Sequence, residues 1–340
     1  MEEKLISICI PTYNRPVELK RLLESIDTTK YDDVNIVISE NCSPKQKETR
    51  EVVEVFKAYS KYEVLYFENE RNLGYDKNIR ALLTRSTGRF SMFFSDDDVF
   101  MLEAMDGFVE FVRQHKDVGF ILRSYRNIYE DGSHQDFRYY DEDKVFPAGK
   151  ETSIEIYDKT CFLSGFTIRT EYARQYVTDE LDGYLLYQQY LLLEVCRRYP
   201  AAYSRILISK ALPENIHYFG ESEEEKELFK GHDMDGKNNL NLVLGDFKVI
   251  NYVANKYHDD TAKRIGKNLA KLSYPSLAVE RRKNRGLKSF VKYSNELRKI
   301  GYGVSIYFYI YFFALLIFGA PLCDKVIVYL KKKIGHRPKL

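Results

Sequence analysis

The chain has 340 residues, enough to bury a large core and, by length alone, to form about two or three folding units. Lysine and arginine total 52 against 50 aspartates and glutamates, so the charge balance gives no reason to expect nucleic acid as a partner. Five scattered cysteines without a CxxC spacing indicate neither a disulfide framework nor a zinc cluster. The N-terminus lacks the pattern of a secretory signal, and we expect the bulk of the protein to stay in the cytoplasm.

The first hundred residues alternate β-rich runs with amphipathic helical patterns. A strand is predicted at residues 5–10, followed by a helix from Pro16, a residue suited to a first helical turn. The same order then repeats. Further strands are predicted at 34–39, 63–68 and 89–95, and further helices at 47–60 and 76–88.

This alternation predicts βα units and a mostly parallel, Rossmann-like α/β sheet flanked by helices. Ligands of such sheets bind beyond the carboxyl ends of the strands. Each predicted strand ends in polar residues, at 12–15, 39–43, 69–74 and 95–98. We therefore expect four segments that are distant in the sequence to converge on one crevice.

The later chain is less regular. Residues 103–129 predict a helix and then a strand, and the turn-rich residues 130–150 predict a surface loop or hairpin. Residues 181–200 predict a helix with a thick apolar face, and residues 212–300 are mainly helical and charged.

The C-terminus has a different composition. Residues 301–323 are uncharged, rich in tyrosine and phenylalanine, and broken by Pro321, and they are nominally long enough to span a bilayer. Together with the amphipathic residues 324–333, they fit a helix pair that dips into one leaflet, with lysines on anionic head groups. A buried terminal hairpin is the alternative. We divide the chain into a catalytic domain (1–212), a helical region (213–300) and a membrane-associating segment (301–340).

Three adjacent carboxylates, Asp96, Asp97 and Asp98, follow an apolar strand. They repel one another and lose hydration unless a positive charge lies with them. Mg²⁺ and Mn²⁺ prefer oxygen ligands and commonly bridge carboxylates to substrate phosphates. On an extended chain Asp96 and Asp98 point to the same side and provide two ligands to one ion. A solvated acidic turn is the alternative interpretation.

Three stretches around this triplet resemble the family 2 glycosyltransferases of the GT-A fold in motif, order and spacing. They are SICIPTYNRPVELKRLLESI (7–26), VNIVISENCS (34–43) and ERNLGYDKNIRALLTRSTGRFSMFFSDDD (70–98). One turn departs from the family, since residues 40–43 read Glu-Asn-Cys-Ser where many members have Asp-Asp-Gly-Ser. The later YQQYLLLEV is most similar to bacterial enzymes that build surface polysaccharide, including abequosyltransferase-like members.

The resemblance implies a site for a nucleotide-sugar donor with Mn²⁺ or Mg²⁺ as cofactor. The cation would act as a Lewis acid that neutralises the leaving nucleoside diphosphate. The implied donor-binding residues are Pro11, Thr12, Tyr13, Glu40, Arg71, Asn72, Gly74, Asp96 and Asp97. The implied metal ligands are Asp98, Asp96 and His232, with His217 as a further histidine candidate, and Gly165 would line the acceptor sugar.

The general base of the reaction is not evident. Many inverting members carry a Glu-Asp pair beneath the acceptor, and here Gln188 and Gln189 stand in that region. An amide cannot take a proton as a base. Asp182 is the nearest carboxylate, although it equally suits a helix cap. If transfer proceeds with retention, the leaving phosphate takes the proton and a glutamine hydrogen-bonds the sugar, so the stereochemistry is open.

We expect a metal-dependent glycosyltransferase whose acceptor is a lipid-linked saccharide at the cytoplasmic face of a bacterial membrane. Its product would belong to surface polysaccharide, such as O-antigen or capsule. The alternative is a catalytically silent, membrane-attached binder of nucleotide sugars, which the glutamine pair favours. A nucleotidyltransferase would be expected to show a Gly-rich basic loop, which PTYNRPVE (11–18) does not provide.

Overall fold

The computed structural model describes residues 4–26, 29–213, 217–231, 236–283 and 286–334, with side chains up to residue 329. Its strands are β1 (Lys4–Thr12), β2 (Val34–Glu40), β3 (Glu63–Glu68), β4 (Gly88–Phe93), β5 (Val99–Phe100), β6 (Phe120–Ile128), β7 (His134–Phe137), β8 (Lys144–Phe146), β9 (Phe166–Arg169) and β10 (Ala201–Ala211). Its helices are α1 (Pro16–Ser25), α2 (Gln46–Tyr59), α3 (Gly74–Arg85), α4 (Ala104–Gln114), α5 (Lys150–Ile156), α6 (Thr170–Arg174), α7 (Tyr187–Arg198), α8 (Gly236–Tyr257), α9 (Thr261–Lys271), α10 (Tyr274–Arg282), α11 (Leu287–Ile300) and α12 (Ile306–Ile334).

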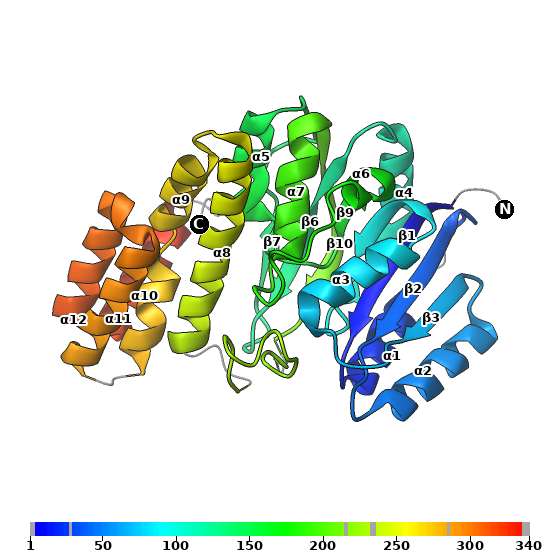
Figure 1. Cartoon of the computed structure of the whole chain (residues 1–340), viewed down its shortest axis with the longest axis horizontal. Coiled ribbons are helices and arrows are strands. Elements are labelled where there is room, and N and C mark those ends of the chain that lie inside the picture. The colour runs from blue at the N-terminus through cyan, green and yellow to red at the C-terminus, as the bar shows by residue number, and fades with distance from the viewer. Residues whose placement is uncertain (1–3, 27–28, 214–216, 232–235, 284–285, 335–340) are drawn as a thin grey trace.

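One mixed sheet organises the molecule, with strand order β3-β2-β1-β4-β9-β6-β10-β5. The first four strands are parallel to their neighbours, β1 to β2 and β4, and β2 to β3. Strand β9 is antiparallel to both β4 and β6, whereas β6 and β10 are parallel. Helices α8 to α12 lie together on the side of the molecule away from α1 and α2 (Figure 1). The predicted α/β sheet with flanking helices and a helical C-terminal region is confirmed.

The first strands are buried on both faces, as continuous apolar runs predict. Ile8 and Ile36 pack on one face with Leu19 and Leu22 of α1. The alternate residues of the same strands, such as Cys9 and Val37, pack on the other face with α3. Since successive side chains of a strand point to opposite faces, the βα pattern fixes which helix covers which side.

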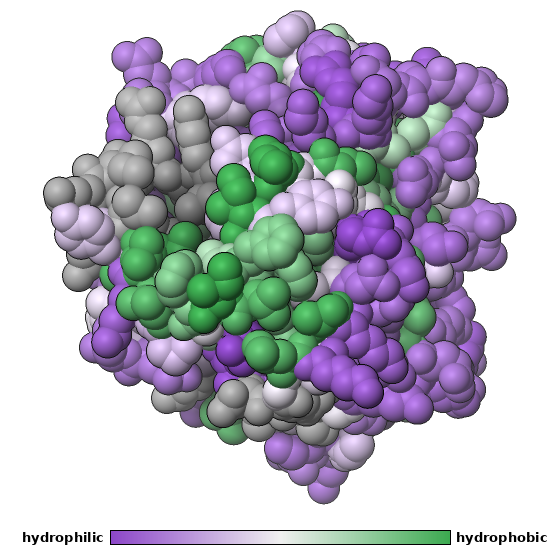
Figure 2. Space-filling view, turned by 90° about the vertical axis from the view of Figure 1, so that its left-hand side faces the viewer, coloured by the Kyte–Doolittle hydropathy of each residue, from purple (hydrophilic) through white to green (hydrophobic). Residues whose placement is uncertain are grey.

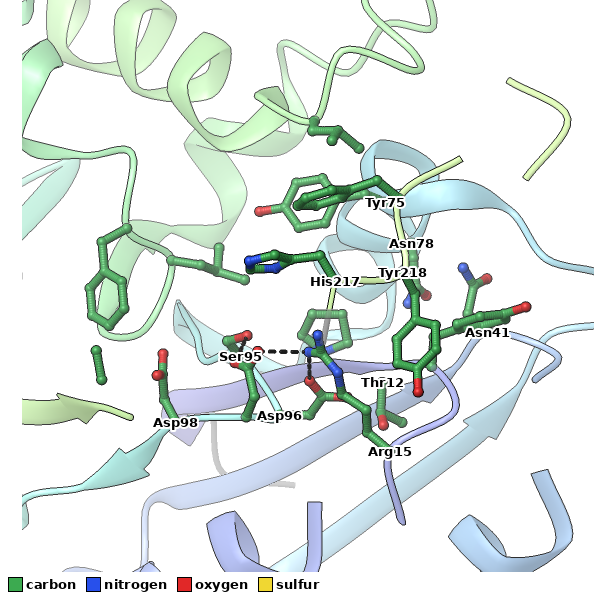
Figure 3. Close-up of a pocket in the computed structure, with 18 of the residues that line it drawn as sticks. Thr12, Arg15, Asn41, Tyr75, Asn78, Ser95, Asp96, Asp98, His217 and Tyr218 are labelled. Carbon is green, nitrogen blue, oxygen red and sulfur yellow. Dashed lines mark hydrogen bonds and ion pairs between the residues drawn. The ribbon is translucent and has the colours of Figure 1, made fainter. Parts of the chain in front are cut away.

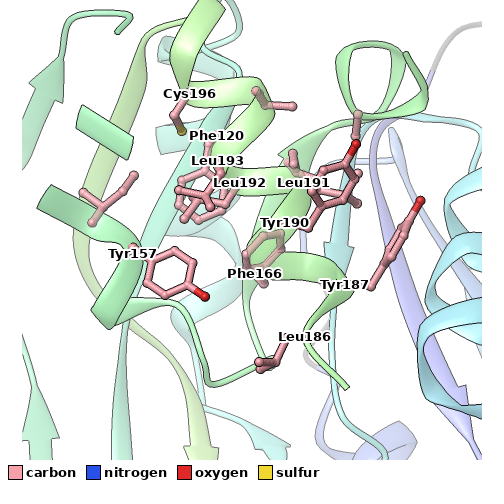
Figure 4. Packing of buried hydrophobic residues seen from close by; sticks show 14 of the residues in the cluster. Phe120, Tyr157, Phe166, Leu186, Tyr187, Tyr190, Leu191, Leu192, Leu193 and Cys196 are labelled. Carbon is pink, nitrogen blue, oxygen red and sulfur yellow. The ribbon is translucent and has the colours of Figure 1, made fainter. Parts of the chain in front are cut away.

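Helix α7 lies at the centre of the larger core cluster (Figure 4). Every residue from Tyr187 to Cys196 is buried, because α7 is enclosed by the sheet, α3, α5 and α8. Gln188 and Gln189, which lie in the first turn, are therefore buried polar side chains rather than surface ones.

Two regions contain more strand than expected. The predicted loop or hairpin at 130–150 contains β7 and β8, which pair with β6 and β10. Strand β10 was not predicted, because its mixed sequence AAYSRILISKA lacks a clean alternation. Helix α12 is divided at Gly319, where φ is 74° and ψ is 167°, into two helical pieces, which agrees with the predicted helix pair. The domain boundaries at residues 212 and 300 stay a prediction.

Candidate functional site

A cavity of about 610 Å³ lies at the carboxyl ends of the first strands (Figure 3). The loops after β1, β2, β3 and β4 all contribute to it, which is the convergence expected of a parallel α/β sheet. The lining residues from these loops are Pro11, Thr12, Tyr13, Arg15, Asn41, Asn72, Gly74, Ser95, Asp96, Asp97 and Asp98. The rest of the wall is Tyr75, Asn78, Tyr125, Asn127, Cys161, Phe162, Leu163, Leu185, Ala211, Leu212, His217, Tyr218, Phe219 and Glu225.

Most of the predicted donor and metal residues meet in this cavity. Those that line it are Pro11, Thr12, Tyr13, Asn72, Gly74, Asp96, Asp97, Asp98 and His217. Those that do not line it are Glu40, Arg71, Gly165, Asp182, Gln188 and Gln189. His232 lies outside the described residues. The roles of all these residues stay predictions.

The acidic triplet does not continue the strand as an extended chain. Strand β4 ends at Phe93, and the backbone then turns, with the Asp98 amide donating to the Ser95 carbonyl at 3.3 Å. Asp96 and Asp97 consequently converge on one nitrogen of the Arg15 guanidinium, at 2.8 Å each. Asp98 turns away and accepts a hydrogen bond from the Ser164 hydroxyl at 2.5 Å. The expected alternation, with Asp96 and Asp98 on one side, is therefore not the arrangement in this structure.

The three carboxylates differ in how their charge is compensated. Burial raises the pKa of Asp96 to about 6, although Arg15 lowers it. Burial also raises the pKa of Asp98, to about 8, and the neighbouring Asp97 adds to that rise. In the described part of the chain Asp98 has no ion-pair partner, and Figure 3 shows it apart from the Arg15 guanidinium. A buried carboxylate in this state is stabilised by any cation that enters the cavity.

The charge of the lining residues bears on the expected metal. Four acidic side chains line the cavity, Asp96, Asp97, Asp98 and Glu225, against a single arginine. No group of three or more ligating side chains among the described residues is arranged to hold a metal ion. Oxygen donors around an uncompensated negative charge nevertheless suit Mg²⁺ or Mn²⁺ when phosphate oxygens complete the coordination. The residues present thus fit a cation that is bound together with a phosphorylated ligand.

The segment 217–231 closes one side of the cavity, and sequence reasoning largely missed it. The Tyr218 ring lies 5.4 Å from the Arg15 guanidinium carbon and 5.8 Å from the Tyr13 ring. Glu225 accepts a hydrogen bond from the Tyr75 amide at 2.6 Å, in the first turn of α3. Gly74 has φ of +75°, and a side chain there would meet Glu225. Glycine at this position therefore allows the segment to pack on α3.

A second wall, which adjoins the acidic triplet at the Ser164–Asp98 hydrogen bond, is built around a buried arginine. Arg123 on β6 donates to the carbonyls of Lys159, Phe162 and Ser164, at 2.8, 2.5 and 3.4 Å. These bonds fix the loop that carries Cys161, Phe162 and Leu163 into the cavity. A Cβ on Gly165, whose φ is +87°, would lie 2.7 Å from the Arg123 side chain. Gly165 thus packs behind this wall, and its acceptor role stays a prediction.

The catalytic candidates lie behind the cavity surface. Gln188 accepts a hydrogen bond from the Tyr75 hydroxyl at 3.2 Å and donates to the Cys161 carbonyl at 3.4 Å, and both partners line the cavity. Gln189 donates to the Tyr157 carbonyl at 3.3 Å. Asp182 accepts two hydrogen bonds from Arg80, at 2.8 and 3.0 Å.

Two predicted donor residues have other partners. The Glu40 carboxylate is buried and accepts hydrogen bonds from the amides of Cys42 and Ser43, at 2.8 and 3.0 Å, and from Gln46. It therefore orders the turn that enters α2. Arg71 is mostly exposed and lies 3.9 Å from Glu224.

The comparisons with known proteins agree with this geometry. The family model described as Glycosyl transferase family 2 matches residues 7–170. This match spans just under half of the chain, so residues 7–170 are similar to glycosyl transferase family 2. Two curated relatives are abequosyltransferase RfbV of Salmonella typhimurium, 36% identical over 103 residues, and an uncharacterized glycosyltransferase of Haemophilus influenzae, 31% identical over 117 residues. The matches cover 30% and 34% of this chain, and only 30% and 37% of the respective relatives.

Solved structures of low sequence identity share the fold. S. aureus TarS 1-349 in complex with UDP-GlcNAc has a TM-score of 0.59 at 16% identity, over 87% of this chain and 80% of that chain. The mannosyltransferase PcManGT from Pyrobaculum calidifontis, in complex with GDP-Man and Mn²⁺, has a TM-score of 0.51 at 10% identity. That match covers 97% of this chain and 81% of the other. At such identities the likeness shows the fold alone.

Proposed function

We propose that the protein transfers a sugar from a nucleotide-sugar donor to a saccharide acceptor with the help of Mn²⁺ or Mg²⁺. The observation that carries this proposal is the cavity itself, in a chain whose residues 7–170 match the model of glycosyl transferase family 2. The loops after four parallel strands line this cavity, and the loop after β4 carries the buried acidic triplet. The negative charge of the triplet is only partly compensated by other side chains. A nucleotide-sugar donor is an anion, and the charged side chains that line the cavity are mainly acidic, so the two would repel each other. A divalent cation bound between them would offset this repulsion.

The donor would occupy the side of the cavity formed by these loops. Thr12, Tyr13 and Asn72 line the cavity and would contact the nucleotide. Asp96 and Asp98, which also line it, would ligate the cation. A divalent ion bound there supplies Lewis-acid stabilisation of the leaving nucleoside diphosphate. Two solved structures of the same fold contain such ligands, UDP-GlcNAc in TarS and GDP-Man in PcManGT. They support the proposal that the donor is a sugar linked to a nucleoside diphosphate.

The acceptor would lie against the second wall, near Phe162 and Leu163. The proton acceptor for its hydroxyl stays open between two routes. Asp182 would have to leave Arg80 to act as the base, since their two hydrogen bonds occupy both of its carboxylate oxygens. Gln188 instead reaches the wall through Tyr75 and Cys161, which supports a sugar-binding role in a retaining reaction.

A catalytically silent binder of nucleotide sugars is the second candidate. It is favoured by the two glutamines, which stand where many family members carry carboxylates, and by the pairing of Asp182 with Arg80. The test is to incubate the purified full chain with Mn²⁺ and UDP, GDP, CDP and dTDP sugars. Mn²⁺-dependent release of nucleoside diphosphate, even by slow hydrolysis, supports the transferase. Stabilisation by a donor without any release would support the binder.

We also propose that α12 rests on the cytoplasmic face of a bacterial membrane, where a lipid-linked acceptor for surface polysaccharide would be held. One described helix, Ile306–Tyr329, is long and apolar enough to cross a bilayer. Phe308, Leu315 and Cys323, however, pack into the core of the C-terminal helices, and Arg282 pairs with Asp324 at 2.8 Å. A helix with one face fixed in this way favours a position in the plane of the interface.

The other face of α12 is apolar and exposed. It carries Tyr307, Ile310, Phe313, Ile317 and Phe318, and Figure 2 shows an apolar patch on this side of the molecule. We expect the full chain to float with phosphatidylglycerol vesicles, and the double variant Phe313→Asp, Ile317→Asp to stay in the aqueous fraction. Val17→Asp, at an exposed apolar position of α1, is the matched control. Equal flotation of the double variant would contradict the proposal.

A further inference from the structure

Arg15 has a special position among the residues that line the cavity. It is the only arginine or lysine among the described lining residues, and its side chain is 13% exposed. It lies in the short turn between β1, which ends at Thr12, and Pro16, the first residue of α1. An anionic ligand that enters the cavity therefore meets one permanently positive side chain. That side chain is already ion-paired with carboxylates of the protein.

The engagement of Arg15 is well defined. One guanidinium nitrogen bridges Asp96 and Asp97 at 2.8 Å each. The acidic partners are themselves held in place, because the Ser95 hydroxyl donates to Asp97 at 2.6 Å and Arg21 donates to the Asp97 carbonyl at 3.1 Å. Burial lowers the pKa of Arg15, but the attraction of both carboxylates outweighs that and raises the pKa above its usual range.

This ion pair competes with both proposed ligands. A divalent cation needs the carboxylate oxygens that Arg15 occupies, and the guanidinium repels a cation that binds beside it. The diphosphate of a donor, in turn, is the kind of anion that a guanidinium binds in a bidentate manner. Binding of one ligand therefore changes the cost of binding the other.

We propose that Arg15 is a positioning residue that serves as the counter-ion of Asp96 and Asp97 until the donor arrives. Mn²⁺ or Mg²⁺ alone then binds weakly, since Asp98 is the one carboxylate of the triplet without an ion pair in the described structure. A nucleoside diphosphate gives the guanidinium a new anionic partner and frees the two carboxylates for the cation. Metal and donor consequently bind as a coupled pair. This inference rests on the proposed function, which supplies the two ligands.

The test is a titration of the full chain with Mn²⁺, followed through the electron paramagnetic resonance signal of free aqueous Mn²⁺. It is done without nucleotide and with UDP, GDP, CDP or dTDP, with protein-free nucleotide as blank. The wild type should bind Mn²⁺ alone at least about tenfold more weakly than in the presence of the accepted nucleotide. Equal affinity in both conditions would overturn the inference without any variant.

Substitutions then assign the coupling to Arg15. Arg15→Gln should bind Mn²⁺ alone about tenfold more tightly than the wild type, and the gain on adding nucleotide should shrink. Arg15→Lys, which keeps the charge, should stay near the wild type. Arg113→Gln is the matched control, because Arg113 pairs with Asp33 away from the triplet and does not line the cavity.

The outcomes separate this inference from the proposed function. Unchanged or weaker Mn²⁺ binding by Arg15→Gln, in a protein that still melts cooperatively, overturns the role of Arg15 and leaves the transferase proposal standing. If the wild type binds no Mn²⁺ with any of the nucleotides, the metal-dependent reaction fails and the inference fails with it. The inference is supported if Arg15→Gln binds Mn²⁺ alone more tightly than the wild type and Arg15→Lys does not.

Discussion

The two sides of the cavity differ in chemistry and in how they are built. The side formed by the loops after β1 to β4 carries Arg15 and the acidic triplet, and its residues follow their strands directly. The second side presents Tyr125, Phe162 and Leu163, and it depends on a buried arginine that binds backbone carbonyls. The first side is suited to a charged diphosphate and the second to the less polar surface of a sugar. The comparison teaches that strand order alone assembles the charged side, whereas tertiary packing assembles the other.

The largest expected effect is on the charged side. Asp98→Asn should lower Mn²⁺-dependent release of nucleoside diphosphate by about 100-fold or more, because it would remove a proposed metal ligand at the leaving group. The measurement is the initial rate with the best donor of the panel. Asp117→Asn, at an exposed position after α4, is the control and should leave the rate unchanged. If Asp98→Asn kept its activity, the charged side of the cavity would not be the side that binds the cation and the leaving diphosphate.

The next effect is on the stability of the second side. Arg123→Met should lower the free energy of unfolding by roughly 2–4 kcal/mol, since it leaves three carbonyls of the 159–164 loop without their donor. Urea denaturation measures this change. Arg113→Met, which loses an exposed ion pair with Asp33, should cost less than about 1 kcal/mol. Equal losses in the two variants would mean that Arg123 does not organise the wall.

A smaller effect depends on pH and lies behind the same wall. Burial raises the pKa of Asp246 to about 7, although a hydrogen bond from the Tyr157 hydroxyl partly lowers it. The unfolded chain loses this proton near pH 4, so the free energy of unfolding falls as pH rises from about 4 to about 7. Asp246→Asn keeps the acceptor for Tyr157 and cannot ionise.

The variant should therefore gain stability relative to the wild type at pH 8, and gain clearly less at pH 5. Thermal melting at both pH values measures the difference, and we expect a gain of several degrees at pH 8. Asp117→Asn should show no such pH dependence. A gain that is equal at both pH values, or larger at pH 5, would contradict the buried and protonated state of Asp246.

Much of the charged side could be predicted from the sequence. The βα alternation placed the loops after four strands together, and the triplet stood out because three carboxylates follow an apolar run. Arg15 lies inside the same motif, yet a single arginine after a strand has no pattern that reveals its partner 81 residues away. Glu40 shows the reverse case. The sequence suggests a donor-binding carboxylate, but in the structure this carboxylate accepts hydrogen bonds from nearby amides and does not line the cavity.

The other side could not be read in this way. Arg123 lies in the β-rich run FILRSYRNI, where a charged residue suggests solvent, and its burial depends on carbonyls about 40 residues further along. Glu225 belongs to an acidic cluster that looks solvated, but it binds the first turn of α3, 150 residues away. Such contacts follow from tertiary packing, which local periodicity does not encode.

The central claim is that the acidic triplet holds a cation against the diphosphate of a sugar donor. The most direct measurement is an anomalous difference map from crystals grown with Mn²⁺ and the accepted nucleoside diphosphate. We predict a single strong peak within bonding distance of an Asp98 carboxylate oxygen and of a phosphate oxygen. A nucleotide bound in the cavity with no such peak, or with Mn²⁺ bound away from the triplet, would contradict the account.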